Sequence, residues 1–316
     1  MMSKRKYHPI EVTIKKEASN FGIHKVLIAL SGGADSIATA FSLKQTDIAI
    51  RALHCNFHLR AEESNRDMEF VKEFCAIHDI PLEIKEFDVN DYMKHHKGIS
   101  VEMACRDLRH DWFRLKLTET GYDRIATGHN ADDNIETFFL NLLRGSGTRG
   151  LKGMTKDNGV LWRPILQFHR NEILEYLEGY NLRFVVDSTN LQNDYRRNLI
   201  RNTIIPLFKE EWKGFNASLD KTIRNLSAEN QIVEYVINNA LSHSDQSISV
   251  STIMSSPAPL LLIKRYIDPL GPFSTTAEEI LSSIKANKPH IRRWRLKDGD
   301  VFLRNGNLFI EMIHGK

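Results

Sequence analysis

The stretch Ser31-Gly32-Gly33-Ala34-Asp35-Ser36 decides the fold of this chain. It follows a short apolar run at residues 26–30 and precedes a helix-like segment at residues 37–43. A strand that turns through two glycines into a helix leaves backbone N–H groups unpaired at the positive end of the helix dipole. The glycines permit close approach of an anion, the serines add hydroxyl donors, and the aspartate can hold a cation or accept from a backbone amide. We therefore predict a phosphate-binding turn rather than an ordinary capped helix start.

This turn differs from the two commonest phosphate loops. The Walker pattern ends in Gly-Lys-Ser/Thr and the dinucleotide fingerprint reads G-x-G-x-x-G, and neither pattern occurs at this turn. The hexapeptide instead resembles the SGGxDS loop of the N-type ATP pyrophosphatases, the PP-loop superfamily. Members of that superfamily bind ATP and release pyrophosphate while they adenylate a carbonyl oxygen. Some act on small molecules and others on RNA, so the rest of the chain must decide between these substrate classes.

Length and composition set the broad class. A chain of 316 residues favours two domains, and 41% hydrophobic with 26% charged residues is ordinary for a globular protein. The net charge of +3 is only mildly basic, so nucleic-acid affinity must come from local clusters. No apolar run approaches the roughly 20 residues of a membrane helix, and no signal core follows the N-terminus, so we expect a cytoplasmic protein without membrane contact. The three cysteines form no C-x-x-C pair and are expected to be reduced thiols.

The order of predicted elements indicates an α/β fold. Predicted strands at residues 26–30, 47–55, 81–87 and 124–128 alternate with helical patterns, which favours a mostly parallel sheet covered on both faces. Ligands of such sheets bind beyond the carboxyl ends of the strands, which brings the hexapeptide, His54 and His129 to one edge. We place this PP-loop adenylation domain at residues 1–210. Residues 211–316 are expected to form a smaller, mainly helical domain that ends in a β-meander around two turn dipeptides.

A second set of polar residues lies in the sequence ATGHNADDNIET at residues 126–137. Asp133 and Glu136 are three residues apart and would share one face near the start of a helix. Paired carboxylates there could hold Mg²⁺ or a substrate ammonium group, and His129 could bind phosphate or move a proton. The alternative is an acidic helix cap that only complements the helix dipole.

Arginines supply a third set. Arg106 and Arg109 would project from one helix face and could neutralise a leaving pyrophosphate, although a solvated face with a Glu102–Arg106 pair would look the same. Arg163 follows a short apolar run. Arg196, Arg197 and Arg201 follow the sequence Asp187-Ser188-Thr189-Asn190, and their density suits the phosphates of RNA or ATP, with a plain surface cluster as the alternative.

Taken together, these segments resemble the tRNA(Ile)-lysidine synthetases. The sequences SGGADS, HCNFHLR, EMACRDLR, ATGHNADDNIET, RGSG, WRPIL and DSTN…YRRNLIRN occur in that family's order across residues 25–205. The second motif of the family usually reads HVDHGLR, whereas here Cys55, Asn56 and Phe57 replace its interior. We expect this difference to alter the adenine pocket rather than to abolish activity.

The resemblance implies a two-step reaction. ATP adenylates the C2 oxygen of the wobble cytidine of a tRNA(Ile) with a CAU anticodon, and the amine of free L-lysine then attacks C2 and expels AMP. The implied ATP-binding residues are Ser31 to Ser36 together with His54, and Asp35 and Asp133 are the implied Mg²⁺ ligands. Arg109, His129 and Arg201 would stabilise phosphate charge, while Asp133 and Glu136 would hold Mg²⁺ or the lysine ammonium.

The remaining arginines, Arg106, Arg163, Arg196 and Arg197, would contact phosphates of ATP or tRNA. The region after residue 210 and the basic stretch at residues 290–295 would serve tRNA docking. Longer members of the family carry a further C-terminal domain, most of which a chain ending at Lys316 is expected to lack. A homodimer is one possible assembly, because the sequence does not determine the oligomeric state.

Three alternatives compete with this interpretation. A 2-thiocytidine synthetase would share the first motif but generally uses C-x-x-C cysteines. A small-molecule amide ligase would have no clear use for a basic second domain. A non-enzymatic nucleotide- or tRNA-binding module would keep the glycines without needing Asp35, Asp133 and Glu136 together.

Overall fold

The computed structural model describes residues 7–60, 62–186, 195–241, 247–271, 274–286 and 292–312. The chain forms two compact units, Met1–Asn225 and Leu226–Lys316. They divide inside the long helix α11 (Phe215–Leu241), whereas the sequence analysis places the domain boundary at residue 210. The sequence Asp187-Ser188-Thr189-Asn190 and part of the basic stretch at 290–295 lie outside the described residues.

The first unit is built around a five-stranded parallel sheet with the order β3-β2-β1-β4-β5. Its strands are β1 (Lys25–Ala29), β2 (Ala49–Asn56), β3 (Leu82–Glu86), β4 (Arg124–Ala126) and β5 (Leu161–Trp162). Its helices before α11 are α1 (Pro9–Phe21), α2 (Ala34–Lys44), α3 (Glu62–Ile77), α4 (Val89–His95), α5 (Val101–Thr120), α6 (Ala131–Leu143), α7 (Thr148–Leu151), α8 (Arg170–Gly179), α9 (Tyr195–Leu199), the π-helix η2 (Ile200–Ile204) and α10 (Ile205–Glu211).

Strand order reverses between β1 and β4, because β2 and β3 extend the sheet on one side and β4 and β5 on the other. At such a reversal the connections leave the sheet in opposite directions and open a crevice at the carboxyl ends of the strands. The hexapeptide follows β1 and the segment Thr127–Asn130 follows β4, so both border this crevice.

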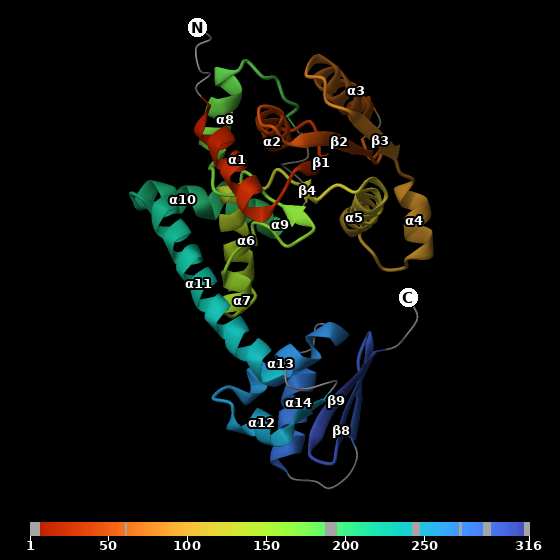
Figure 1. Ribbon diagram of the computed structural model, residues 1–316, viewed down its shortest axis with the longest axis vertical. Helices are drawn as coiled ribbons and strands as arrows, with labels where there is room; N and C mark the ends of the chain where they lie inside the picture. Colours follow the sequence, from red (N-terminus) through yellow and green to blue (C-terminus); the bar gives the residue numbers. More distant parts are fainter. Residues whose placement is uncertain are drawn as a thin grey trace. The chain divides into compact units, whose positions relative to one another are not determined.

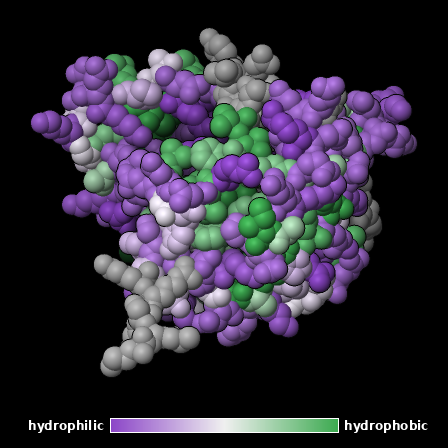
Figure 2. Space-filling model, turned by 90° about the horizontal axis from the view of Figure 1, so that it is seen from above, coloured by the Kyte–Doolittle hydropathy of each residue, from purple (hydrophilic) through white to green (hydrophobic). Residues whose placement is uncertain are grey.

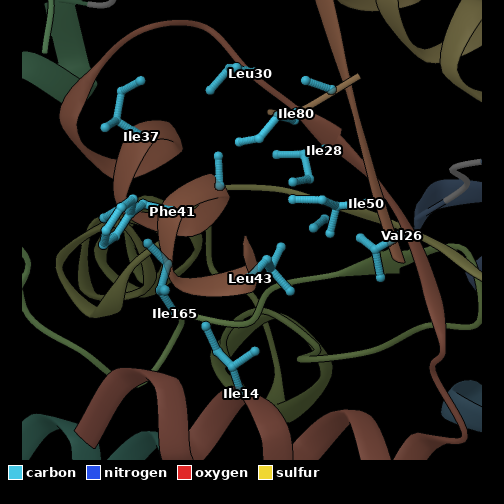
Figure 3. Close-up of a cluster of buried hydrophobic side chains, with 14 of the residues drawn as sticks. Ile14, Val26, Ile28, Leu30, Ile37, Phe41, Leu43, Ile50, Ile80 and Ile165 are labelled. Atoms are coloured by element: carbon cyan, nitrogen blue, oxygen red, sulfur yellow. The ribbon is translucent and has the colours of Figure 1, made fainter. Parts of the chain in front are cut away.

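Alternating side chains of the strands form two apolar layers. Val26 and Ile28 of β1 pack with residues of α1, α2, α3 and α8, and Figure 3 shows part of this cluster, including Ile14, Phe41 and Ile165. Leu27 points to the other face, where it packs with Trp112 and Phe113 of α5. Figure 1 shows these helices around the sheet. Burial on both faces explains why the strands read as continuous apolar runs.

The second unit contains a four-stranded antiparallel sheet with the order β6-β9-β8-β7. Its elements are β6 (Ser247–Ser249), α12 (Val250–Ser255), α13 (Pro259–Ile267), the 3₁₀ turn η3 (Asp268–Leu270), α14 (Ser274–Lys285), β7 (Arg292–Arg295), β8 (Gly299–Arg304) and β9 (Asn307–Met312). Side chains from one face of the sheet, such as Val301 and Leu308, pack with Ile263 and Ile280 of the helices.

The α/β class, the parallel sheet and the C-terminal meander are therefore confirmed. The sequence analysis did not identify β5, β6, α4 or the helices α12 to α14 as elements. His54 lies inside β2, near the carboxyl end of the strand, and pairs in register with Ile84 of β3. The strand was predicted at residues 47–55, and it begins at Ala49 and ends one residue later than predicted, at Asn56.

Figure 2 shows a mainly hydrophilic face, with hydrophobic residues gathered toward its middle. No helix within the described ranges is long and apolar enough to cross a membrane.

Candidate active site

The turn after β1 is held by its own serines. Ser36 Oγ accepts hydrogen bonds from the backbone N–H groups of Ser31 (3.2 Å) and Gly32 (3.1 Å), and it donates to the carbonyl of Gly33 at 2.9 Å. The hydroxyl of Ser36 is therefore used inside the turn, and its predicted bond to phosphate stays a prediction. Gly32 has φ +90°, a conformation that favours glycine, whereas Gly33 has an ordinary φ of −71°. These hydrogen bonds hold the turn, and α2 begins at Ala34.

Asp35 is fixed by residues far away in the sequence. Its Oδ1 accepts from Asn130 Nδ2 at 3.1 Å, and its Oδ2 accepts from the guanidinium of Arg170. Asn130 precedes α6 and Arg170 is the first residue of α8. The structure therefore gives Asp35 side-chain partners, whereas the sequence suggested a cation or a backbone amide.

Gly128 allows the two strand-end turns to lie against each other. A Cβ atom at this position would lie 2.8 Å from the backbone carbon of Asp35 and 2.9 Å from the backbone nitrogen of Ser36. Such distances are not tolerated, and backbone atoms cannot rotate away as a side chain can. The β4–α6 turn reaches the start of α2 only because residue 128 is glycine.

A cavity of about 700 Å³ opens at this edge of the sheet. Of the residues that the sequence analysis assigned to the site, those that line it are Ser31, Gly33, Asp35, Ser36, His54, Arg106, Arg109, His129, Arg163 and Arg197. The assigned residues that do not line it are Gly32, Ala34, Asp133, Glu136, Arg196 and Arg201. The side chain of Ala34 is buried, so only its backbone is available to a ligand at the start of α2. Arg196 is exposed and lies outside the cavity lining.

The residues of β2 that line the cavity, Leu53 to Asn56, carry no formal charge. His54 is buried, its Nδ1 lies 2.8 Å from the carbonyl oxygen of Leu30, and burial lowers its pKa, so the ring is neutral. Burial also raises the pKa of the Cys55 thiol to about 12. The guanidinium of Arg109 lies over the ring of Phe57 at 5.4 Å. Apolar and neutral groups of this kind suit a flat aromatic ligand.

Two carboxylates and two arginines form a closed group behind the cavity. Glu136 is only 1% exposed and accepts from Arg197 Nε at 2.7 Å and from Arg201 Nε. Asp133 Oδ1 accepts from Arg197 Nη2 at 3.2 Å and from Arg201 Nη2 at 3.1 Å. The arginines come from α9 and the π-helix η2, an irregularity found frequently at functional sites. The shared face that we predicted for Asp133 and Glu136 is present.

Burial and charge set the pKa values of this group. Burial, followed by the charge of Glu136, raises the pKa of Asp133 to about 6. Burial alone would lower the pKa of Arg201, but its hydrogen bond to Glu136 and the nearby carboxylate charges outweigh that effect and raise it. Arg201 therefore stays charged, and the two guanidinium groups compensate two carboxylates that would otherwise be costly to bury.

His129 lies at the end of β4 among positive charges. Burial, and then the charges of Arg163, Arg197, Arg106 and Arg109, lower its pKa to about 4. Its Nδ1 lies 2.8 Å from Thr127 Oγ1. The imidazole is therefore neutral near pH 7 and can donate or accept a hydrogen bond, but it carries no charge with which to balance phosphate.

A charged cluster that the sequence analysis missed joins α6, α8, α10 and α11. His169 Nδ1 lies 3.3 Å from Asp132 Oδ2, and its Nε2 lies 3.0 Å from Asp220 Oδ2. Asp132 also accepts from the backbone N–H of Arg170 (2.8 Å) and from Lys209 Nζ (2.9 Å). The hydrogen bonds to Asp132 and Asp220 raise the pKa of His169 to about 9. The only local sequence signal for this region is Glu172, three residues after His169. It accepts from the His169 backbone N–H and marks the start of a helix, but it does not indicate the charged cluster.

We expect the stability supplied by His169 to depend on pH. Because its pKa rises on folding from 6.5 to about 9, the folded state holds the proton more tightly. The stabilisation is complete below pH 6.5 and is lost as the pH rises through about 9, on the order of 2–3 kcal/mol in total. Urea unfolding of wild type and His169→Gln across this range should show a stability difference that shrinks at high pH. A difference that does not change with pH would contradict this assignment.

The fold and the site define a class of protein. Residues 6–208 match the family model of the PP-loop domain, which is more than half of the chain. Among solved structures, the U34-tRNA thiolase NcsA of Methanococcus maripaludis superposes with a TM-score of 0.57 and 19% identity, over 69% of this chain and 78% of that one. At this identity the likeness shows the fold alone. The chain is a PP-loop protein.

Curated relatives define the family within this class. A tRNA(Ile)-lysidine synthase of Bacteroides thetaiotaomicron is 38% identical over 296 residues, which cover 92% of this chain and 69% of that protein. The enzyme of the same name from Parabacteroides distasonis is 36% identical, over 88% of this chain and 64% of that protein. The one from Borreliella burgdorferi is 31% identical, over 97% and 71%. The chain belongs to the tRNA(Ile)-lysidine synthase family.

Proposed function

We propose that this protein is a ligase that joins free L-lysine to C2 of the wobble cytidine of tRNA(Ile) with a CAU anticodon. ATP first adenylates the cytidine, with release of pyrophosphate, and the lysine amine then displaces AMP to give lysidine. The observation that carries the proposal is the shared cavity. It brings the PP-loop, His54, Arg109 and His129 together at one sheet edge in a chain whose relatives are tRNA(Ile)-lysidine synthases.

The triphosphate is proposed to bind at the turn between β1 and α2. The N-terminus of α2 offers backbone N–H groups and the positive end of its dipole. Arg109 lines the same cavity and can compensate the charge that develops on departing pyrophosphate. The adenine would lie toward β2, against His54 and Phe57, where the lining is neutral and partly aromatic.

Mg²⁺ fits the carboxylates of this site. The described residues hold no group of three or more His, Cys, Asp or Glu side chains arranged to bind a metal. Mg²⁺ does not need such a group, because it ordinarily keeps waters and substrate phosphates and takes only one or two carboxylates. Asp35 lines the cavity, and its charge contributes to the raised pKa of Asp133, so these two residues would hold the ion. The bound ion would neutralise phosphate charge.

The closed group of Asp133, Glu136, Arg197 and Arg201 is proposed to position the substrates for the second step, in which the lysine amine attacks. Arg197 both lines the cavity and contacts Glu136, so it links the buried carboxylates to the bound substrates. For Asp133 or Glu136 to hold Mg²⁺ or a lysine ammonium, an arginine must turn toward phosphate. Neutral His129 is proposed to orient a substrate by a hydrogen bond, since its pKa of about 4 leaves it unprotonated near pH 7.

The same proposal divides the chain into an adenylation domain at residues 1–210 and a tRNA-docking region at residues 211–316. The docking role is supported by the basic strand β7, which carries Arg292, Arg293 and Arg295. Phosphate contacts from such arginines would position the tRNA without reading its sequence.

Lysine incorporation tests the proposed function. Purified protein with ATP, Mg²⁺, labelled lysine and the CAU-anticodon transcript is expected to label the RNA and to release AMP and pyrophosphate. The matched control is the same transcript with the wobble cytidine replaced by uridine, which should stay unlabelled. If no lysine is incorporated while another substrate supports ATP–pyrophosphate exchange, the proposal is wrong.

A further inference from the structure

Three arginines in the cavity wall form no ion pair with a carboxylate of the described residues. Arg106, Arg109 and Arg163 all line the cavity, and within the described ranges none of them forms an ion pair with Asp or Glu. This differs from Arg197, which lines the same cavity but is held by Asp133 and Glu136. Unbalanced arginines in a cavity are a common feature of sites that bind anions.

Arg163 is the member of this set that the fold holds most firmly. It follows β5 directly, and its backbone N–H donates to the carbonyl of Lys156 at 2.8 Å. Its Nη1 donates to the carbonyl of Thr155 at 2.6 Å. Its Nε is buried and has no hydrogen-bond partner among the described residues. The guanidinium is therefore anchored at one nitrogen and has donor capacity left over.

The placement of Arg163 has a cost that an anion would remove. Burial, and then the charge of Arg106, lower the pKa of Arg163. The same arginines help to lower the pKa of His129. Like charges held together in a partly buried site repel each other. An anion bound between the arginines would replace this repulsion by attraction.

The sheet order separates this subsite from the nucleotide. His54 and Phe57 lie at β2, the PP-loop follows β1, and Arg163 follows β5. Strands β1 and β4 lie between β2 and β5, so a nucleotide with its base at β2 and its phosphates at β1 leaves the β5 side for another substrate. Met154 and Leu161 line the cavity too and offer apolar surface for an aliphatic stem.

We propose that Arg163, assisted by Arg106, binds the α-carboxylate of the free lysine substrate. This inference rests on the proposed function, because it identifies the recognition site for its amino-acid substrate. A guanidinium fork matches a carboxylate in shape and charge. Binding at that end leaves the aliphatic chain and the side-chain amine directed away from Arg163, and the amine is the group that must reach C2. Arg163 thereby selects an α-amino acid over a simple amine.

Steady-state kinetics with two nucleophiles test this inference. Lysinamide keeps both amines of lysine but replaces the carboxylate by a neutral amide. Wild type is expected to use lysinamide about 10- to 100-fold less efficiently than lysine, since a hydrogen bond to a charged group is lost. Arg163→Gln should lose about the same factor with lysine but little with lysinamide, so that the two substrates become nearly equal. The KM values for ATP and tRNA should not change.

The controls separate the possible failures. Arg114→Gln lies on α5 beyond the cavity lining and should behave as wild type, and Arg163→Lys should recover part of the lysine preference. If wild type incorporates lysine and lysinamide equally well, or if Arg163→Gln instead raises the KM for ATP or tRNA, the inference is overturned while the proposed function stands. If wild type incorporates no lysine at all, the proposed function fails and this inference fails with it. The comparison of the two nucleophiles on wild type is independent of whether the variant folds.

Discussion

Glu136→Gln is expected to abolish most lysine incorporation and to destabilise the protein. Glu136 is 1% exposed and accepts from both Arg197 and Arg201. A glutamine would leave these two arginines with Asp133 as their remaining carboxylate. Because the arginine side chains are 37% and 40% exposed, water partly compensates them, and the loss is about 1–3 kcal/mol. Arg197 would also lose the anchor that fixes it at the cavity, and misplacement of a positioned group costs about a hundredfold in rate. Urea unfolding and single-turnover incorporation measure the two effects.

A double-mutant cycle isolates the pair. Arg201→Gln combined with Glu136→Gln should cost less stability than the sum of the single variants, because the double variant leaves fewer unpaired charges. The matched control is Glu175→Gln on the exposed face of α8, which should be neutral in both assays. Incorporation by Glu136→Gln within a few-fold of wild type would show that the buried carboxylate has no part in the reaction.

The features that could be predicted from sequence are those set by local patterns. The apolar runs and the turn Ser31–Ser36 sufficed to predict β1, α2 and the parallel sheet, because a buried strand and a glycine turn are written in consecutive residues. The shared face of Asp133 and Glu136 followed from helical spacing alone. The predicted end of β2 was one residue too early, because Asn56 is not a typical strand residue and yet pairs with β3.

The features that could not be predicted depend on contacts between distant segments. Arg170 reaches Asp35 across 135 residues, and no pattern around either residue indicates this pairing. His169 lies between two aspartates from α6 and α11, so its raised pKa follows from tertiary packing rather than from its neighbours in sequence. The strand β5 spans only Leu161–Trp162, too short to show a period, although it places Arg163 at the cavity.

The same reasoning applies to the hydroxyl donors of the turn. The sequence shows that Ser36 has a hydroxyl but not that this hydroxyl accepts from two N–H groups of its own turn. An internal hydrogen bond and a ligand hydrogen bond need the same residue type. Only the geometry distinguishes a serine that shapes the turn from one that is free to bind phosphate.

Gly128→Ala is expected to weaken ATP binding strongly and to lower stability. The new Cβ would lie 2.8 Å from the backbone carbon of Asp35, so the β4–α6 turn must move away from the start of α2. That movement would stretch the 3.1 Å hydrogen bond from Asn130 to Asp35 and shift His129 at the cavity wall. Overpacking of this kind costs about 1–3 kcal/mol, and the upper end applies because the obstructing atoms belong to the backbone. Displacement of the binding groups should weaken ATP binding about a hundredfold.

Calorimetric titration with ATP and thermal unfolding check both effects, and Gly179→Ala provides the matched control. Gly179 is the last residue of α8, and a Cβ there would meet no atom within 4 Å, so alanine should bind ATP as wild type does. Alanine is also the better helix former, so this control should unfold at the same temperature or slightly higher. If Gly128→Ala bound ATP normally, the two turns would have to separate without disturbing the ligand. The close packing of residue 128 against Asp35 would then be a feature of the fold and not of the site.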